Sequence, residues 1–117
     1  MNKNILHAEV APTKIGRGSR ATFLLRFNIE PSDGGGYDYE EIRLPGGRLH
    51  YAGIVAALIR SHYTQDDVEA IMNNYVASKT TEHKDEWQAL QDWRTRAKEI
   101  AMELISLIRT NNEDSEG

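Results

Sequence analysis

The sequence predicts an α+β fold, with a small antiparallel β-sheet of about three strands in the N-terminal half and three α-helices in the C-terminal half, the last one long. Apolar and polar residues alternate in the first half, which is typical of half-buried strands. In the second half apolar residues recur at helical spacing, and Pro45-Gly46-Gly47 separates the two patterns. A chain of 117 residues has the length of one domain, which we expect to span residues 1–110.

The clearest strand is the middle one, where Phe23, Leu25, Phe27 and Ile29 share one face. Polar residues share the other face, interrupted by Leu24. The short connections favour an antiparallel meander, in which each strand pairs with the next along the chain. Whether the first strand pairs within this sheet is left open by the sequence. The predicted strands span about residues 5–10, 21–30 and 37–44.

The first predicted helix is apolar nearly all round, which indicates burial on several sides. Gly53 inside it costs about 1 kcal/mol relative to Ala, so we expect a close approach of the sheet or of another helix there. Thr64 and Asp67 have the spacing of a capping box at the start of the second helix. Its apolar stripe consists of Val68, Ile71, Met72, Tyr75 and Val76. The three helices are predicted over about residues 49–61, 65–77 and 82–109.

The last helix should be ~42 Å long at about 1.5 Å per residue, whereas a compact chain of this length has a radius of gyration of ~13 Å. It should therefore overhang its own domain, and its apolar stripe continues into the overhang. A protein partner or a second copy of the chain is expected to cover that stripe. The polar, acidic segment 111–117 is expected to be a disordered tail. The residues predicted to carry the contact are Trp87, Trp93, Ile100, Leu104 and Leu107.

The first two helices also have the outline of a DNA-binding helix-turn-helix. In that motif the start of the second helix meets DNA phosphates. Here that turn is Gln65-Asp66-Asp67-Val68-Glu69, which would press three carboxylates against a polyanion. Residues 1–50 carry a net charge of +1 and residues 51–117 a net charge of −5, whereas broad nucleic-acid surfaces are usually basic. Packing within a core is therefore favoured over DNA recognition.

Two basic segments keep an alternative function open, that of a nucleic-acid-associated regulator. The loop at residues 12–20 places Lys14, Arg17 and Arg20 among two glycines and a serine, which suits anion binding, although the P-loop spacing is absent. The other interpretation is a flexible, solvated connection between strands. The second segment is the face formed by Arg94, Arg96 and Lys98, where acidic residues alternate with the cations.

Enzymatic chemistry and cofactors are not expected. The chain has no cysteine, its four histidines lie far apart in the sequence, and no nucleophile-elbow motif occurs. Glu40 and Glu41 are neighbours on a strand and point to opposite faces. No metal site is expected either. The N-terminus lacks a signal peptide and no apolar run reaches the ~20 residues of a membrane span, so the expected location is cytoplasmic.

Two stretches, YAGIVAALIRSHYTQDDVEAIMNNY and WQALQDWRTRAKEIA, resemble short uncharacterised prophage-encoded proteins of gut Bacteroidales. Those proteins share a strand-rich N-terminal half, a YxxIVxALIRxxYTxDDVEAIxNNY core and a WRxxAKxIA helix. The resemblance covers about residues 20–105. It implies a phage-structural or assembly-associated role, with a virion-associated location in that case, and it carries no catalytic residues to this chain.

Overall fold

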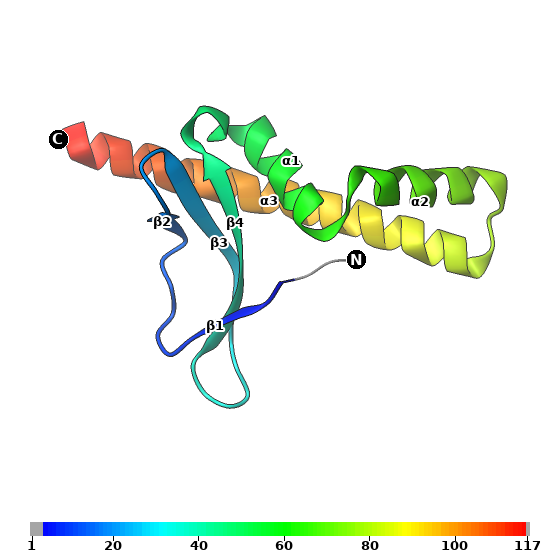
Figure 1. The fold of residues 1–117 in the computed structure, drawn as a ribbon, viewed down its shortest axis with the longest axis horizontal. Helices are drawn as coiled ribbons and strands as arrows, with labels where there is room; N and C mark the ends of the chain where they lie inside the picture. The colour runs from blue at the N-terminus through cyan, green and yellow to red at the C-terminus, as the bar shows by residue number, and fades with distance from the viewer. Residues whose placement is uncertain (1–3, 117) are drawn as a thin grey trace.

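The computed structural model describes residues 4–116, with side chains described as far as residue 110. It confirms the α+β class and the long last helix, but the sheet has four strands where the sequence predicts about three (Figure 1). The elements in chain order are β1 (Leu6–Ala8), β2 (Ile15–Arg17), β3 (Thr22–Pro31), β4 (Tyr37–Pro45), the short 3-10 turn η1 (Gly46–Arg48), α1 (Tyr51–His62), α2 (Gln65–Ala77) and α3 (Thr81–Glu116).

The strand order is β1-β4-β3-β2, with every neighbouring pair antiparallel. The predicted meander is therefore wrong, because β1 pairs with β4 at the far side of the central hairpin. The unpredicted strand β2 lies inside the loop expected at residues 12–20. It is three residues long, and Ile15 is its single apolar residue. Such a segment is too short to show an alternating pattern, and its pairing with β3 defines it as a strand.

The inner face of the sheet is formed by the register of the two long strands. Phe23 lies opposite Leu44, Leu25 opposite Ile42, and Phe27 opposite Glu40. These positions alternate with outward-facing ones, as the sequence predicts for period-two strands. The inner face packs against α1 and α3 to form the hydrophobic core. The buried apolar residues of that core are Leu25, Phe27, Ile42, Leu44, Ile54, Leu58, Tyr63, Leu90, Trp93, Ala97, Ile100, Ala101 and Leu104.

A β-bulge interrupts β3 after Phe27. The register shifts between Phe27 and Glu30, and Asn28 takes a positive φ of 51°. Asparagine tolerates this left-handed conformation better than most residues. The alternation predicts Asn28 on the face opposite Phe27, but the bulge turns its side chain toward Glu40 on the inner side of the sheet. Bulges re-aim side chains in this way.

Helix α1 begins directly after a tight turn. His50 caps its first turn, because its Nδ1 accepts a hydrogen bond from the backbone N–H of Gly53 at 3.1 Å. A Cβ on Gly53 would lie 2.2 Å from the carbonyl oxygen of Arg48. The glycine is therefore required by the backbone of η1, and the predicted close approach of the sheet or another helix is not its cause.

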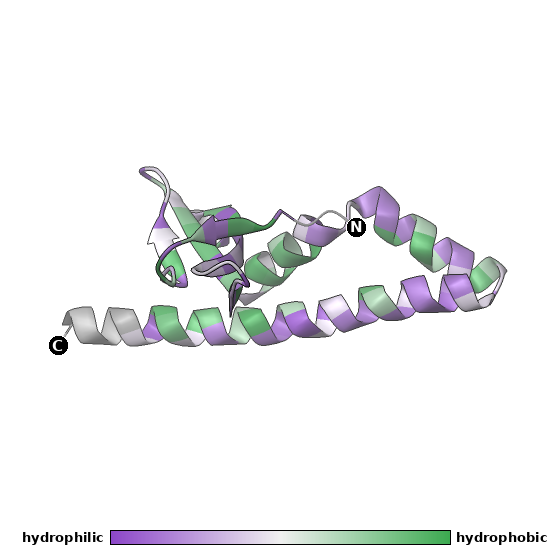
Figure 2. Cartoon of the chain, turned by 90° about the horizontal axis from the view of Figure 1, so that it is seen from below, coloured by the Kyte–Doolittle hydropathy of each residue, from purple (hydrophilic) through white to green (hydrophobic). Residues whose placement is uncertain are grey.

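Helices α2 and α3 make the molecule elongated. Its radius of gyration is 16.4 Å, compared with the ~13 Å of a compact chain of this length. Figure 2 shows α2 and the N-terminal part of α3 extending together past the sheet. None of the helices in the described part of the chain is long and apolar enough to cross a membrane.

The end of α3 differs from the prediction. The helix continues to Glu116, whereas the sequence predicts a disordered tail over 111–117. No proline or glycine occurs between residue 82 and residue 116, so nothing in this stretch breaks the helix as those two residues do.

Candidate functional site

The α2–α3 hairpin is the part of the fold with the least internal packing. Helix α2 runs back along the N-terminal part of α3, and the ring of Tyr75 stacks on Trp87 with centroids 4.6 Å apart. All thirteen residues of α2 are described, and none of them is buried. The five apolar residues of the predicted stripe, which we call the α2 stripe, are Val68, Ile71, Met72, Tyr75 and Val76. One neighbouring helix therefore covers only part of this stripe.

The uncovered part of the α2 stripe lies at Met72 and Val76, which are one helical turn apart. Their exposed fractions are 37% and 78%. Val68 and Ile71 pack partly against the core, so they mark the side of α2 that faces α3. The hairpin thus presents apolar surface to solvent along one edge of α2.

The base of the hairpin is fixed by the predicted capping box, which the structure confirms. The Thr64 hydroxyl accepts from the Asp67 backbone N–H at 3.0 Å, and the Asp67 carboxylate accepts from the Thr64 backbone N–H at 3.0 Å. The hydrogen bond that the Thr64 backbone N–H donates to the carboxylate, followed by the hydrogen bond with the Thr64 side chain, lowers the pKa of the Asp67 carboxyl below its ordinary value. Burial, assisted by the negative charge of Asp67, raises the pKa of the Tyr63 hydroxyl.

Three of the five predicted partner-binding residues lie in the core of the same chain. Trp93, Ile100 and Leu104 are 8%, 3% and 1% exposed. They are therefore not available to a partner, which corrects the prediction for these positions. The sheet and α1 cover this part of the stripe on α3, and helical spacing alone cannot show which element covers a stripe.

The other two predicted partner-binding residues are accessible. Trp87 is half-buried beneath Tyr75 in the hairpin, and Leu107 is 37% exposed near the opposite end of α3. They lie twenty residues apart on one helix, about 30 Å at 1.5 Å per residue. They therefore belong to two separate surfaces.

The cations of the basic loop are engaged by different neighbours. Lys14 forms an ion pair with Glu103 on α3. The Arg17 guanidinium lies over the ring of Phe23, 4.9 Å from its centroid, and donates a long hydrogen bond of 3.5 Å to the Arg20 carbonyl oxygen. Arg20 is exposed. Because Lys14 is neutralised by Glu103, the loop has less charge available for an anion than the sequence suggests.

In the second basic segment, formed by Arg94, Arg96 and Lys98, Arg96 is likewise engaged by neighbouring side chains. Arg96 donates to Glu99 at 3.5 Å and to the Asn28 side-chain oxygen at 3.4 Å. The neighbouring Trp93 is buried, so it cannot provide a stacking platform beside Arg94 and Lys98. Aromatic stacking on nucleobases requires an accessible ring.

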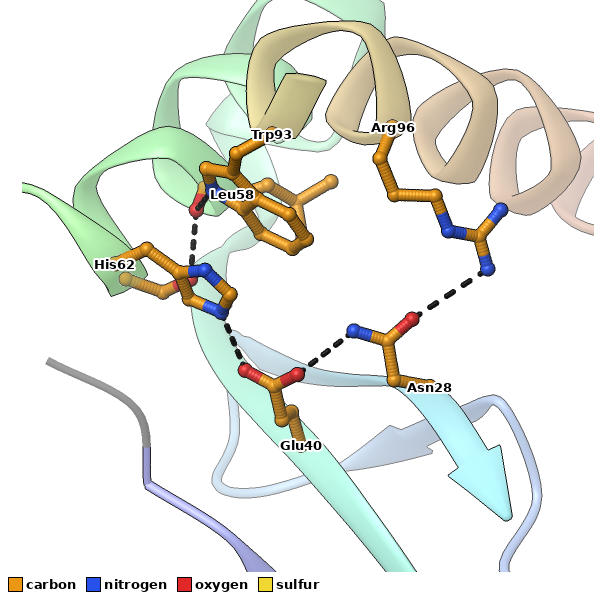
Figure 3. Close-up of polar contacts among 7 residues, drawn as sticks. Asn28, Glu40, Leu58, His62, Trp93 and Arg96 are labelled. Atoms are coloured by element: carbon orange, nitrogen blue, oxygen red, sulfur yellow. Dashed lines mark hydrogen bonds and ion pairs between the residues drawn. The ribbon is translucent and has the colours of Figure 1, made fainter. Parts of the chain in front are cut away.

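A buried polar network that no motif in the sequence predicts joins the two halves of the fold (Figure 3). His62 Nε2 lies 2.6 Å from Glu40 Oε1, and the Asn28 amide donates to Glu40 Oε2 at 2.7 Å. Glu40 and His62 are 4% and 2% exposed. The network connects β4, β3 and α1, and Arg96 extends it to α3. The sequence feature that points to this network is Glu40, a charged residue on the same face of β4 as the buried Ile42 and Leu44.

The indole of Trp93 covers one face of the His62 ring in this network. It stacks on the His62 ring with centroids 3.7 Å apart and planes inclined by 9°, and its N–H donates to the Leu58 carbonyl at 3.0 Å. Among the described residues, every buried side-chain nitrogen and oxygen has a hydrogen-bond partner. A carboxylate can orient a catalytic imidazole in this manner, but here the ring face is covered and the pair acts as a cross-link between α1 and β4.

The other three histidines have separate partners. His7 pairs with Asp38, His50 caps α1, and His83 contacts the Ser78 carbonyl oxygen. Among the described side chains, no three His, Asp or Glu groups lie where they could hold a metal ion.

Comparisons with protein-family models, with curated proteins and with solved structures find no match to this chain.

Proposed function

We propose that this protein is a non-enzymatic assembly protein that associates with a second copy of itself through the α2–α3 hairpin. The observation that carries this proposal is that α2, a helix of thirteen residues with an apolar stripe, buries none of them within its own chain. An isolated helix shorter than about 12–15 residues is marginal in water. Contact with α3 alone therefore leaves α2 weakly held, and further burial of the stripe would stabilise it.

A second hairpin is the occupant that fits this surface. Two helical hairpins packed face to face form a four-helix bundle, in which each apolar stripe is covered by the other three helices. A two-fold axis relates identical patches, so Met72 and Val76 of one copy would meet the hairpin of the other. The stacked rings of Tyr75 and Trp87 supply the aromatic area that is enriched at such interfaces.

The dimensions of the hairpin predict a weak dimer. Helix α2 is about 20 Å long and two packed helices are about 20 Å wide. A face of that size covers about 400 Å² per copy, or about 800 Å² in total, which belongs with small, reversible interfaces. We therefore expect a dimer that dissociates in the micromolar range.

The resemblance to prophage-encoded proteins gives this proposal its biological setting, in which a small self-associating protein assists the assembly of a phage-like particle. The alternative of a nucleic-acid-associated regulator has less support, because Glu103 neutralises Lys14 and Arg96 is shared between Glu99 and Asn28.

Sedimentation velocity of the full chain from low to high micromolar concentration tests the proposal. The wild-type protein should shift from monomer to dimer as the concentration rises. The double substitution Met72→Glu and Val76→Glu should keep the protein monomeric throughout, because four carboxylates would meet in the dimer interface.

A matched control is Met102→Glu, at another exposed methionine that is 65% exposed on α3 outside the hairpin. This variant should dimerise like the wild type, and circular dichroism should show all variants folded. A wild-type protein that remains monomeric at every concentration, or a Met102→Glu variant that dissociates equally, would refute self-association through the hairpin.

A further inference from the structure

Strand β4, one of the two central strands, has no strand partner among the described residues along one edge of its second half. Its first three residues pair with β1, and the register ends at Tyr39. From Glu40 to Pro45 the strand pairs with β3 on one side, and no strand of the described chain pairs with it on the other.

The backbone groups on that free edge can be assigned from the hydrogen-bond pattern. In β3, the Arg26 N–H donates to the Lys14 carbonyl oxygen, and the Thr22 carbonyl oxygen accepts from the Gly18 N–H. The backbone N–H and C=O groups of even-numbered β3 residues therefore point toward β2. In an antiparallel sheet the backbone N–H and C=O groups of successive residues point alternately to the two neighbouring strands. The backbone groups of odd-numbered β3 residues therefore point to β4, and those of the β4 residues opposite them point back to β3. The N–H and C=O groups of Glu41 and Arg43, which lie between these residues, point to the free edge.

A groove runs along this edge between β4 and α1. It has a volume of 450 Å³ and is lined on one side by residues 42–45 and on the other by Ala57, Arg60 and Ser61 of α1. Residues 42–45 alternate between the two faces of the sheet, so a groove that touches all of them follows the edge of the strand. Ala57 and Ser61, one turn apart on α1, line the groove with small side chains.

Two arginines make this groove positive. Arg48 from η1 and Arg60 from α1 both line it and are both exposed. Within residues 4–110, neither guanidinium takes part in an ion pair or a side-chain hydrogen bond. Two uncompensated cations beside an open strand edge favour a strand that carries negative side chains.

We propose that the groove between β4 and α1 binds an extended acidic peptide segment of another protein, which adds to the sheet as a fifth strand beside Glu41 and Arg43. Addition of a peptide to an open edge between a strand and a helix is an established mode of peptide recognition. The backbone of Glu41 and Arg43 would hold the peptide main chain, while Arg48 and Arg60 would select Asp or Glu side chains. This surface is separate from the hairpin and goes beyond the proposed self-association.

The backbone geometry favours a peptide over a nucleic acid. Outward N–H and C=O groups recur every second residue, about 6.6 Å apart at ~3.3 Å per residue, which matches the spacing along another β-strand. A nucleic-acid backbone offers no N–H donors in this register. Pro45 lacks an N–H and therefore ends the ladder at the η1 end of the groove.

The test uses a displayed library of random dodecapeptides selected on the immobilised full-length protein, followed by synthesis of the consensus binder. We expect selected peptides in which Asp or Glu alternates with β-branched residues. In fluorescence anisotropy, Arg48→Glu with Arg60→Glu should weaken binding of the consensus peptide by about tenfold or more. Methylation of alternate backbone nitrogens of the peptide should abolish binding, because it removes the ladder donors.

A control of equal charge change is Arg20→Glu with Arg109→Glu, at two exposed arginines outside the groove, which should alter affinity by less than about twofold. NMR amide exchange should slow at Glu41 and Arg43 when the peptide binds. Failure to enrich any peptide, equal binding by the Arg48 and Arg60 variant, or tighter binding of a DNA duplex than of the peptide would each overturn the proposal. The monomeric Met72→Glu and Val76→Glu variant should bind the peptide normally, which separates this test from that of self-association.

Discussion

His62 and Glu40 form a buried hydrogen-bonded pair at 2.6 Å, which ties the last turn of α1 to the middle of β4. Removing one member leaves the other buried without its partner, and such a loss costs several kcal/mol. We predict that Glu40→Ala lowers the free energy of unfolding by about 3 kcal/mol, measured by urea denaturation at neutral pH.

The control for this prediction is Glu30→Ala, at an exposed carboxylate near the end of the same hairpin. It should change the free energy of unfolding by less than about 0.5 kcal/mol. Equal, small effects of the two substitutions would show that the buried pair does not stabilise the fold.

Gly53 gives a second prediction, because helix propensity and packing have opposite effects on stability when alanine replaces this residue. Alanine favours an exposed helix by about 1 kcal/mol over glycine, yet a Cβ at this position would lie 2.2 Å from the Arg48 carbonyl oxygen. We predict that Gly53→Ala destabilises the protein by about 2 kcal/mol. Gly47→Ala, where a Cβ meets nothing within 4 Å, should be near neutral in the same thermal-unfolding assay. A stabilised Gly53→Ala variant would contradict the close contact.

The two tryptophans should respond differently to replacement by phenylalanine. Trp93 is 8% exposed, stacks on His62 and donates to Leu58. Its replacement removes that hydrogen bond and leaves a cavity, so we predict a loss of about 2 kcal/mol. Trp87→Phe keeps most of the stack with Tyr75 and should cost less than about 0.5 kcal/mol. Equal losses in urea denaturation would place Trp87 in the core as well.

The capping carboxylate Asp67 should make stability depend on pH. Its pKa is lowered in the folded protein by hydrogen bonding to Thr64, mainly by the bond from the Thr64 backbone N–H, so the charged form stabilises the fold at neutral pH. That contribution disappears as the pH falls below the ordinary value of 3.8 and through the lower folded value. Asp67→Asn should therefore unfold at a lower temperature than wild type at neutral pH, and the difference should vanish under acid conditions.

Asp66→Asn provides the comparison for the capping carboxylate, because Asp66 is exposed in the same turn and makes no hydrogen bond with Thr64 among the described contacts. It should leave the pH dependence of the unfolding temperature as in wild type. A difference between Asp67→Asn and wild type that persists at low pH would show that the charge is not the cause.

Sequence patterns predicted those parts of the fold whose determinants are local. The alternation around Leu25 and the capping box at Thr64 each depend on a few neighbouring residues, and both are present in the structure. The strand at Ile15 has no local signal, because its identity comes from pairing with β3. The alternation predicts the wrong face for Asn28 for a related reason, since the bulge at its positive φ reverses the side of the sheet that its side chain occupies.

The candidate surfaces were harder to predict than the fold. Helical spacing predicts that Trp93 and Trp87 belong to one apolar stripe on the last helix. Only the tertiary arrangement shows that the sheet covers Trp93 and leaves Trp87 half-buried. The buried partner of Glu40 comes from a helix more than twenty residues away. The groove beside β4 likewise depends on where α1 lies, which no periodicity specifies.

The short first strand has a consequence for how the sheet can be remodelled. β1 pairs with β4 through three residue pairs, from Leu6 with Tyr39 to Ala8 with Tyr37, and so short a strand pairing opens at low cost in free energy. The edge of the sheet formed by β1 should therefore open before the longer β3–β4 pairing, and the amide hydrogens of residues 6–8 should exchange faster than those at the centre of β3.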